Sequence, residues 1–136
     1  MRYYKIIDGN RISSGGIKNR EMLDAFKRHF PNMRLEISTK KEHDRLCDLE
    51  SDLYDLVLKC EYRFNEDFQK DRKLFYKIRV GDHTSFLVLP NEHCVSVFKE
   101  KYPEATITPC TEEEYMDNYH FSEVLVEFFD KYYTDD

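Results

Sequence analysis

The sequence predicts an α+β protein made of two tandem β-β-α-β-α repeats, packed as a pseudo-twofold protein with a single core. Three observations carry this prediction. The chain matches itself at an offset of 72 positions, the matched halves share one order of strand and helix patterns, and turn and capping residues recur at matching places. We place repeat 1 at residues 1–64, a connector at residues 65–73 and repeat 2 at residues 74–136.

The self-match runs without a gap from residues 3–46 to residues 75–118. Of its 44 aligned pairs 11 are identical, where chance at this composition gives roughly three. The identical pairs are Tyr4/Tyr76, Lys5/Lys77, Ile6/Ile78, Gly9/Gly81, Ser13/Ser85, Asn19/Asn91, Phe26/Phe98, Lys27/Lys99, Pro31/Pro103, Thr39/Thr111 and Glu42/Glu114.

Each repeat opens with a predicted β-hairpin. Apolar and charged residues alternate in the same phase in Tyr3–Ile7 and in Phe75–Arg79, which is typical of a half-buried strand. Gly9 and Gly81 then fall at the turn, where a residue without Cβ adopts positive φ at little cost.

A helix follows each hairpin. Asn19 and Asn91 are the predicted N-caps, and Pro31 and Pro103 end the two helices. The apolar residues share an i, i+1, i+4, i+8 spacing, which places them on one helical face. They are Met22, Leu23, Phe26 and Phe30 in repeat 1, and Cys94, Val95, Phe98 and Tyr102 in repeat 2.

A short strand and a second helix complete each repeat. Thr39 with Glu42, and Thr111 with Glu114, have the T-x-x-E spacing of a capping box and mark where the second helix begins. We expect this amphipathic helix to close its own repeat. Its apolar face consists of Leu53, Leu56, Val57 and Cys60 in repeat 1, and of Leu125, Phe128, Phe129 and Tyr132 in repeat 2.

Composition excludes several classes of protein. The chain has 136 residues, 40% of them hydrophobic, and a formal net charge of -6, so it is too apolar for a disordered chain and too acidic for a general nucleic-acid coat. No apolar run approaches the roughly 20 residues of a membrane helix, and no apolar stretch follows the N-terminus as in a secretory signal. We therefore expect a cytoplasmic protein that does not associate with membranes.

The cysteines give no sign of a metal site. Cys47, Cys60, Cys94 and Cys110 include no C-x-x-C pair, and no spacing to a histidine is typical of zinc. We expect thiols in a reducing compartment, with neither a metal nor a cofactor.

Catalytic motifs are weak. His83-Thr84-Ser85 and His120-Phe121-Ser122 fit the H-x-[ST] signature of 2H-type phosphoesterases, but His83 falls at a hairpin turn and Ser122 reads as the N-cap of the last helix. The histidines and cysteines also do not recur at the 72-residue offset, so we predict no enzyme. A small phosphate-handling enzyme stays as a second alternative, with the stretch around Gly15 and Gly16 as its anion loop.

Charge is the remaining functional signal. Residues 104–136 contain ten acidic side chains against one lysine, which predicts a non-catalytic module that docks on the basic surface of another protein. A nucleic-acid-binding host protein is one candidate partner. The candidate contact residues are Glu112, Glu113, Glu114, Asp117, Glu123, Glu127 and Asp130.

The N-terminal third supports the alternative of direct nucleic-acid binding. Residues 1–34 contain eight basic and three acidic side chains, although the net charge of the chain opposes binding to a polyanion. The candidate contacts are Lys18, Arg20, Lys27 and Arg28, which are also the candidates for holding a smaller anion.

The opening residues resemble a known group. Met1-Arg2-Tyr3-Tyr4-Lys5-Ile6-Ile7 is similar to the start of small uncharacterised accessory proteins of phages and mobile elements of Gram-positive bacteria, which often begin Met-Lys-Tyr-Tyr-Lys-Ile-Ile. The resemblance covers about ten residues of the chain. It implies an accessory protein that acts in the host cytoplasm by inhibiting a host defence component, such as a CRISPR nuclease.

Overall fold

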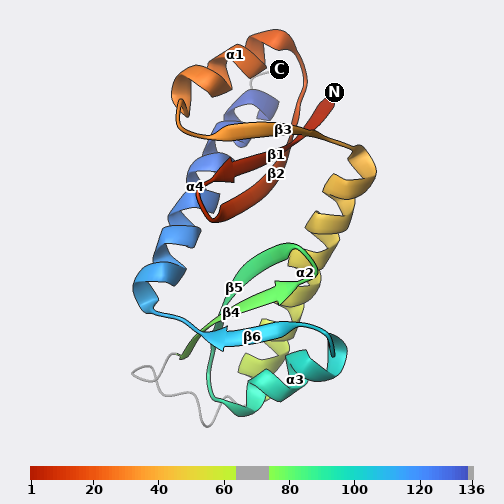
Figure 1. Cartoon of the computed structure of the whole chain (residues 1–136), viewed down its shortest axis with the longest axis vertical. Helices are drawn as coiled ribbons and strands as arrows, with labels where there is room; N and C mark the ends of the chain where they lie inside the picture. The colour runs from red at the N-terminus through yellow and green to blue at the C-terminus, as the bar shows by residue number, and fades with distance from the viewer. Residues whose placement is uncertain (64–73, 135–136) are drawn as a thin grey trace. The chain divides into compact units, whose positions relative to one another are not determined.

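The computed structural model describes residues 1–63 and 74–134, which form an α+β protein with two three-stranded antiparallel sheets and four helices (Figure 1). The predicted connector at residues 65–73 lies outside the described residues. The elements are β1 (Arg2–Asp8), β2 (Arg11–Ile17), α1 (Arg20–His29), β3 (Arg34–Ser38), α2 (Lys40–Arg63), β4 (Leu74–Val80), β5 (His83–Leu89), α3 (His93–Lys101), β6 (Thr106–Pro109) and α4 (Glu112–Thr134).

The two sheets have the same topology. In each, the first strand of a hairpin lies in the centre, which gives the orders β2-β1-β3 and β5-β4-β6. The pairing register also corresponds. Tyr4 lies opposite Gly15 in the first sheet, and the residues 72 positions later, Tyr76 and Leu87, lie opposite each other in the second. Gly9 and Gly81 have φ of 61° and 63°, so both predicted left-handed turns are confirmed.

The predicted boundaries of the first helix in each repeat are largely confirmed. Asn19 caps α1, since its side chain accepts a 2.8 Å hydrogen bond from the backbone N–H of Met22. In the second copy Asn91 lies one residue too early, because α3 begins at His93 and Glu92 occupies the N-cap position. Both helices end before the predicted prolines, α1 at His29 and α3 at Lys101.

The two predicted capping boxes differ. At the start of α4 the box is complete, because Thr111 Oγ1 accepts from the N–H of Glu114 at 3.1 Å and Glu114 Oε1 accepts from the N–H of Thr111 at 3.2 Å. At the start of α2 the Thr39 hydroxyl accepts from the N–H of Glu42, but the Glu42 carboxylate pairs with Arg45 instead. Both boxes still mark the first turn of a long, uninterrupted helix.

The buried residues form two clusters, and each contains a helix from the other half of the sequence. The chain divides into unit 1, Met1–Cys47 with Asn118–Asp136, and unit 2, Asp48–Asp117. Thus most of α4 completes unit 1, and most of α2 completes unit 2. The core of unit 1 comprises Tyr4, Ile6, Ile17, Met22, Ala25, Phe26, Phe30, Phe121, Leu125 and Phe128, and that of unit 2 Leu53, Leu56, Cys60, Ile78, Leu87, Leu89, Cys94, Phe98 and Ala105.

Two expectations are therefore wrong for the described residues. The interior is not a single core, and the second helix of a repeat does not close its own sheet. The reason is helix length: Leu53 lies about 20 Å along α2 from its first residue, at 1.5 Å per residue. The α2 residues that join a core cluster, Leu53, Leu56 and Cys60, consequently lie too far along the helix to cover the sheet that the helix leaves. The predicted faces are correct, and only the surfaces they cover differ.

Because each sheet is covered by a helix from the other half of the sequence, which we call the helix exchange, the position of a core truncation predicts which unit it destabilises. Leu125→Ala should destabilise unit 1 by roughly 2–5 kcal/mol, because it removes a buried side chain from that core. Hydrogen exchange followed by mass spectrometry should then show faster exchange in β1 and β2 than in β4 and β5. Leu53→Ala should give the reverse pattern, and faster exchange of β4 and β5 in Leu125→Ala would contradict the assignment.

Candidate functional site

Charge is unequally divided between the two units. Unit 1 contains 12 lysines and arginines against 11 aspartates and glutamates, a net charge of +1. Unit 2 contains 9 against 16, a net charge of -7, and the two values add to the -6 of the chain. The negative charge of the protein therefore belongs to unit 2, which is the contiguous stretch Asp48–Asp117.

The predicted acidic contact residues are all exposed on α4, but they do not belong to one unit. Three of them lie in unit 1, where Glu127 lines a hollow together with Arg28 and Lys131. This half of the predicted surface is therefore interrupted by cations. The members in unit 2 are Glu112, Glu113, Glu114 and Asp117, and those in unit 1 are Glu123, Glu127 and Asp130.

The helix α2 has a second, exposed apolar stripe that was not predicted from the sequence. Tyr54, Leu58 and Tyr62 follow one another at four-residue spacing and are 63%, 44% and 89% exposed. Exposed carboxylates accompany them, because Asp55 and Glu61 lie three residues before and after Leu58 on the helix. We call these five residues the α2 outer face. Solvent-facing tyrosines are typical of a protein-binding surface, because tyrosine is enriched at interfaces.

Three of the four predicted anion contacts meet at one place in unit 1. Lys18, Arg20 and Lys27 line a hollow of about 500 Å³ beside the first turn of α1, together with Arg2. The hollow also contains one carboxylate, that of Asp24. Lys18 also has a structural role, since its Nζ donates a 2.8 Å hydrogen bond to the carbonyl oxygen of Tyr132 in α4.

Arg28 does not join this group. It lines the hollow on the other side of α1, with Lys131 and Glu127. One helical residue turns by about 100°, so Lys27 and its neighbour Arg28 are directed to different surfaces.

The glycine pair is part of a regular strand. Gly15 and Gly16 lie in β2, opposite Tyr4 and Tyr3 of β1. A Cβ atom on Gly15 would collide with the ring of Phe129, so this glycine allows α4 to approach the sheet. This contact explains why β2 has glycine where the matching strand β5 has Leu87, and it favours a paired strand over an anion loop at Gly15 and Gly16.

The H-x-[ST] residues have different surroundings. His83 is buried, with Nε2 2.5 Å from Glu50 Oε1, and the Ser85 hydroxyl donates to Glu50 Oε2 at 3.2 Å. These bonds connect α2 to β5 within unit 2. His120 and Ser122 both lie inside α4, so the expectation that Ser122 opens the last helix is wrong. His83 thus lies at the start of strand β5, whereas His120 lies in a helix, so the two H-x-[ST] segments do not share one structural context.

The cysteines differ in accessibility and in their neighbours. Cys60 and Cys94 are buried in the core of unit 2. Burial raises the pKa of the Cys110 thiol, the Glu114 carboxylate raises this pKa further, and Lys77 acts in the opposite direction. Cys47 is exposed, with Sγ 3.6 Å from His43 Nε2, and His43 Nδ1 lies 2.8 Å from the Ser14 hydroxyl.

These environments predict an order of thiol reactivity. At about pH 8 iodoacetamide should modify Cys47 first, because it is accessible and beside an imidazole that can accept its proton. Cys110 should follow more slowly, since its raised pKa leaves less thiolate at that pH. Peptide mass spectrometry over time measures the order, and His43→Ala should slow Cys47 selectively. Faster labelling of Cys60 than of Cys47 would contradict the assignment.

Comparisons with known proteins add no family. No protein-family model matches the chain, and searches of curated proteins and of solved structures find no match. Within residues 1–63 and 74–134 no helix has the length and apolar character needed to span a membrane. In the same described part of the chain, no group of three or more His, Cys, Asp or Glu side chains is placed to hold a metal ion.

Proposed function

We propose that the protein is a non-catalytic binding module that docks on a basic surface of another protein through unit 2. The observation that carries the proposal is the net charge of -7 on unit 2 together with the α2 outer face. The resemblance of the first residues to phage and mobile-element accessory proteins suggests the biological setting. In that setting we propose that the protein acts in the host cytoplasm and inhibits a host defence component, such as a CRISPR nuclease.

The two parts of this surface contribute differently to binding. The excess of carboxylates attracts a basic partner over a distance and raises the association rate, an effect that salt screens. The aromatic rings supply contact area that loses its bound water on binding, and tyrosine is enriched among the residues that contribute most to the binding energy. Tyr54 and Tyr62 are therefore the proposed energetic centre, and Asp55 and Glu61 the proposed steering groups.

Direct nucleic-acid binding is the alternative that a specific observation favours. Unit 1 gathers Arg2, Lys18, Arg20 and Lys27 around one hollow, although these residues are separated in the sequence. Such a group could neutralise two or more phosphates of a single strand. The arrangement involves unit 1 alone, so its test can be separated from that of the acidic surface.

We further propose that the chain descends from a duplicated β-β-α-β-α unit with pseudo-twofold symmetry. The strands β4 and β5 begin and end 72 residues after β1 and β2. Ring contacts support the same correspondence: Tyr3 and His43 have centroids 5.0 Å apart, and Phe75 and Tyr115, at the equivalent positions, 5.3 Å apart. In this account an ancestral pair of single units exchanged their last helices, and fusion retained the exchange.

Variants of the α2 outer face test the binding proposal. Protein immobilised by a terminal tag captures partners from extract of the native host, and mass spectrometry compares variants. Tyr54→Ala with Tyr62→Ala should lower recovery of the partner at least tenfold, because truncated interface tyrosines cost about 2 kcal/mol or more. Tyr119→Ala, a 51% exposed tyrosine of unit 1, is the matched control.

The contribution of charge is tested with two double variants that each remove two carboxylates, one pair in unit 2 and one pair in unit 1. Asp55→Asn with Glu61→Gln should slow association with the purified partner, and raising salt from about 50 to about 300 mM should slow the wild type similarly. Glu123→Gln with Glu127→Gln, which removes two carboxylates of unit 1, should have little effect. An association rate insensitive to salt, or equal losses from both pairs, would overturn the proposal.

The nucleic-acid alternative has its own test. If it holds, Arg20→Gln with Lys27→Gln should weaken binding of a short DNA or RNA strand in a mobility-shift assay, and lower the salt slope by roughly one to two. Arg28→Gln with Lys41→Gln removes equal charge outside that hollow and should change binding less. Wild-type protein that shifts no strand at low salt would exclude this alternative.

A further inference from the structure

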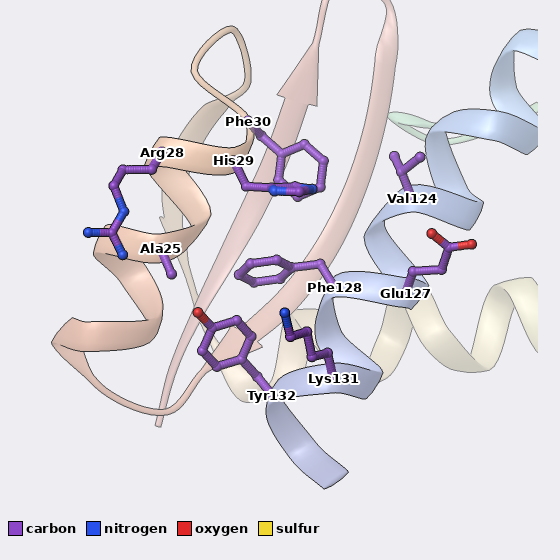
Figure 2. A pocket seen from close by; sticks show the side chains of 9 residues that line it. All are labelled: Ala25, Arg28, His29, Phe30, Val124, Glu127, Phe128, Lys131 and Tyr132. Atoms are coloured by element: carbon purple, nitrogen blue, oxygen red, sulfur yellow. The ribbon is translucent and has the colours of Figure 1, made fainter. Parts of the chain in front are cut away.

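A hollow lies between α1 and α4 in unit 1, with aromatic rings at its floor and charged side chains at its rim (Figure 2). Its volume is about 520 Å³. This volume lies within the range of about 300–1,000 Å³ typical of ligand pockets. Its lining combines aromatic rings with charged side chains and comprises Ala25, Arg28, His29, Phe30, Val124, Glu127, Phe128, Lys131 and Tyr132.

The aromatic floor is part of the packed core of unit 1. Phe30 and Phe128 are buried, with ring centroids 5.7 Å apart in an edge-to-face arrangement. Phe128 also contacts Tyr132 at 4.7 Å, and the exposed ring of His29 stands edge-on to Phe30 at 4.6 Å. The rings are too close for another ring to enter between them, so a ligand would lie against the outer side of the group. A flat apolar body suits such a floor.

The rim favours negative charge. Arg28, His29 and Lys131 are exposed around the hollow, against the single carboxylate of Glu127. Figure 2 shows the Lys131 side chain directed toward Phe128, whereas the Glu127 carboxylate points toward Val124 and away from the rings. The three basic residues also lie in the last turns of their helices, where they offset the partial negative charge of the helix ends. Two permanent cations still face one carboxylate at the rim.

We propose that this hollow binds a planar aromatic compound that carries one anionic group. The ring of the ligand would pack on Phe128 and Tyr132, and its anion would pair with Lys131, whose side chain is directed toward Phe128. The proposal does not depend on the acidic surface of unit 2, because every lining residue belongs to unit 1.

Ligands of one shape and different charge test the proposal directly. Naphthalene-2-carboxylate is titrated into ¹⁵N-labelled full-length protein, and two-dimensional NMR spectra locate the shifted amides. We expect saturable shifts at Ala25, His29 and Val124. Naphthalene-2-methanol, which is neutral, should bind about tenfold more weakly, and 2-naphthylmethylammonium, which is cationic, more weakly still. Cyclohexanecarboxylate keeps the anion without the aromatic ring and should also bind about tenfold more weakly.

Surface variants assign the contacts without disturbing the core. Lys131→Gln should weaken naphthalene-2-carboxylate about three- to tenfold and leave naphthalene-2-methanol unchanged. Lys27→Gln is the matched control. It also removes a lysine from unit 1, but this lysine lines the other hollow. Three results would overturn the proposal: no shifts at millimolar ligand, equal affinity for the neutral or cationic analogue, or equal losses from Lys131→Gln and Lys27→Gln.

Discussion

The position of the apolar stripes along α2 and α4 determines how the rest of the protein is assembled. A helix rises about 1.5 Å per residue, and both helices run without a break from their capping threonines. The side chains of these helices that belong to the two core clusters, such as Leu53 and Leu125, come only after two or more turns. Each three-stranded sheet therefore receives its covering helix from the other half of the sequence. Without that helix each sheet would expose its apolar face to water.

The same exchange changes the composition of the two units more than their charge. Unit 2 is strongly negative and unit 1 is nearly neutral, but residues 74–136 are already strongly negative by themselves, with 5 basic and 13 acidic side chains. It also places the C-terminal part of α4 beside α1, where aromatic rings and cations form the proposed small-molecule site. Gly15 belongs to this arrangement, because its missing side chain makes room for Phe129. The hollow between α1 and α4 thus follows from the same packing constraint as the two cores.

Local features were predictable from the sequence, and long-range pairing was not. Gly9, Asn19 and Pro31 act within a few residues, so their patterns alone predict a turn, a cap and a helix end. An apolar stripe indicates which face of a helix is buried, but not which sheet buries it. At the candidate sites, helical periodicity could have separated Arg28 from Lys27. The second stripe on α2, at Tyr54 and Leu58, could also have been found as a repeat of four-residue spacing.

Methyl nuclear Overhauser effects test the helix exchange most directly, since they report pairs of protons within about 5 Å. In protein with labelled leucine, isoleucine and methionine methyl groups, Leu125 should give cross-peaks to core residues of repeat 1 such as Ile6 and Met22. Leu53 should do the same with Ile78 and Leu89 of repeat 2. Cross-peaks from Leu125 to Ile78, or from Leu53 to Ile6, would show that each helix covers its own sheet and would contradict the account.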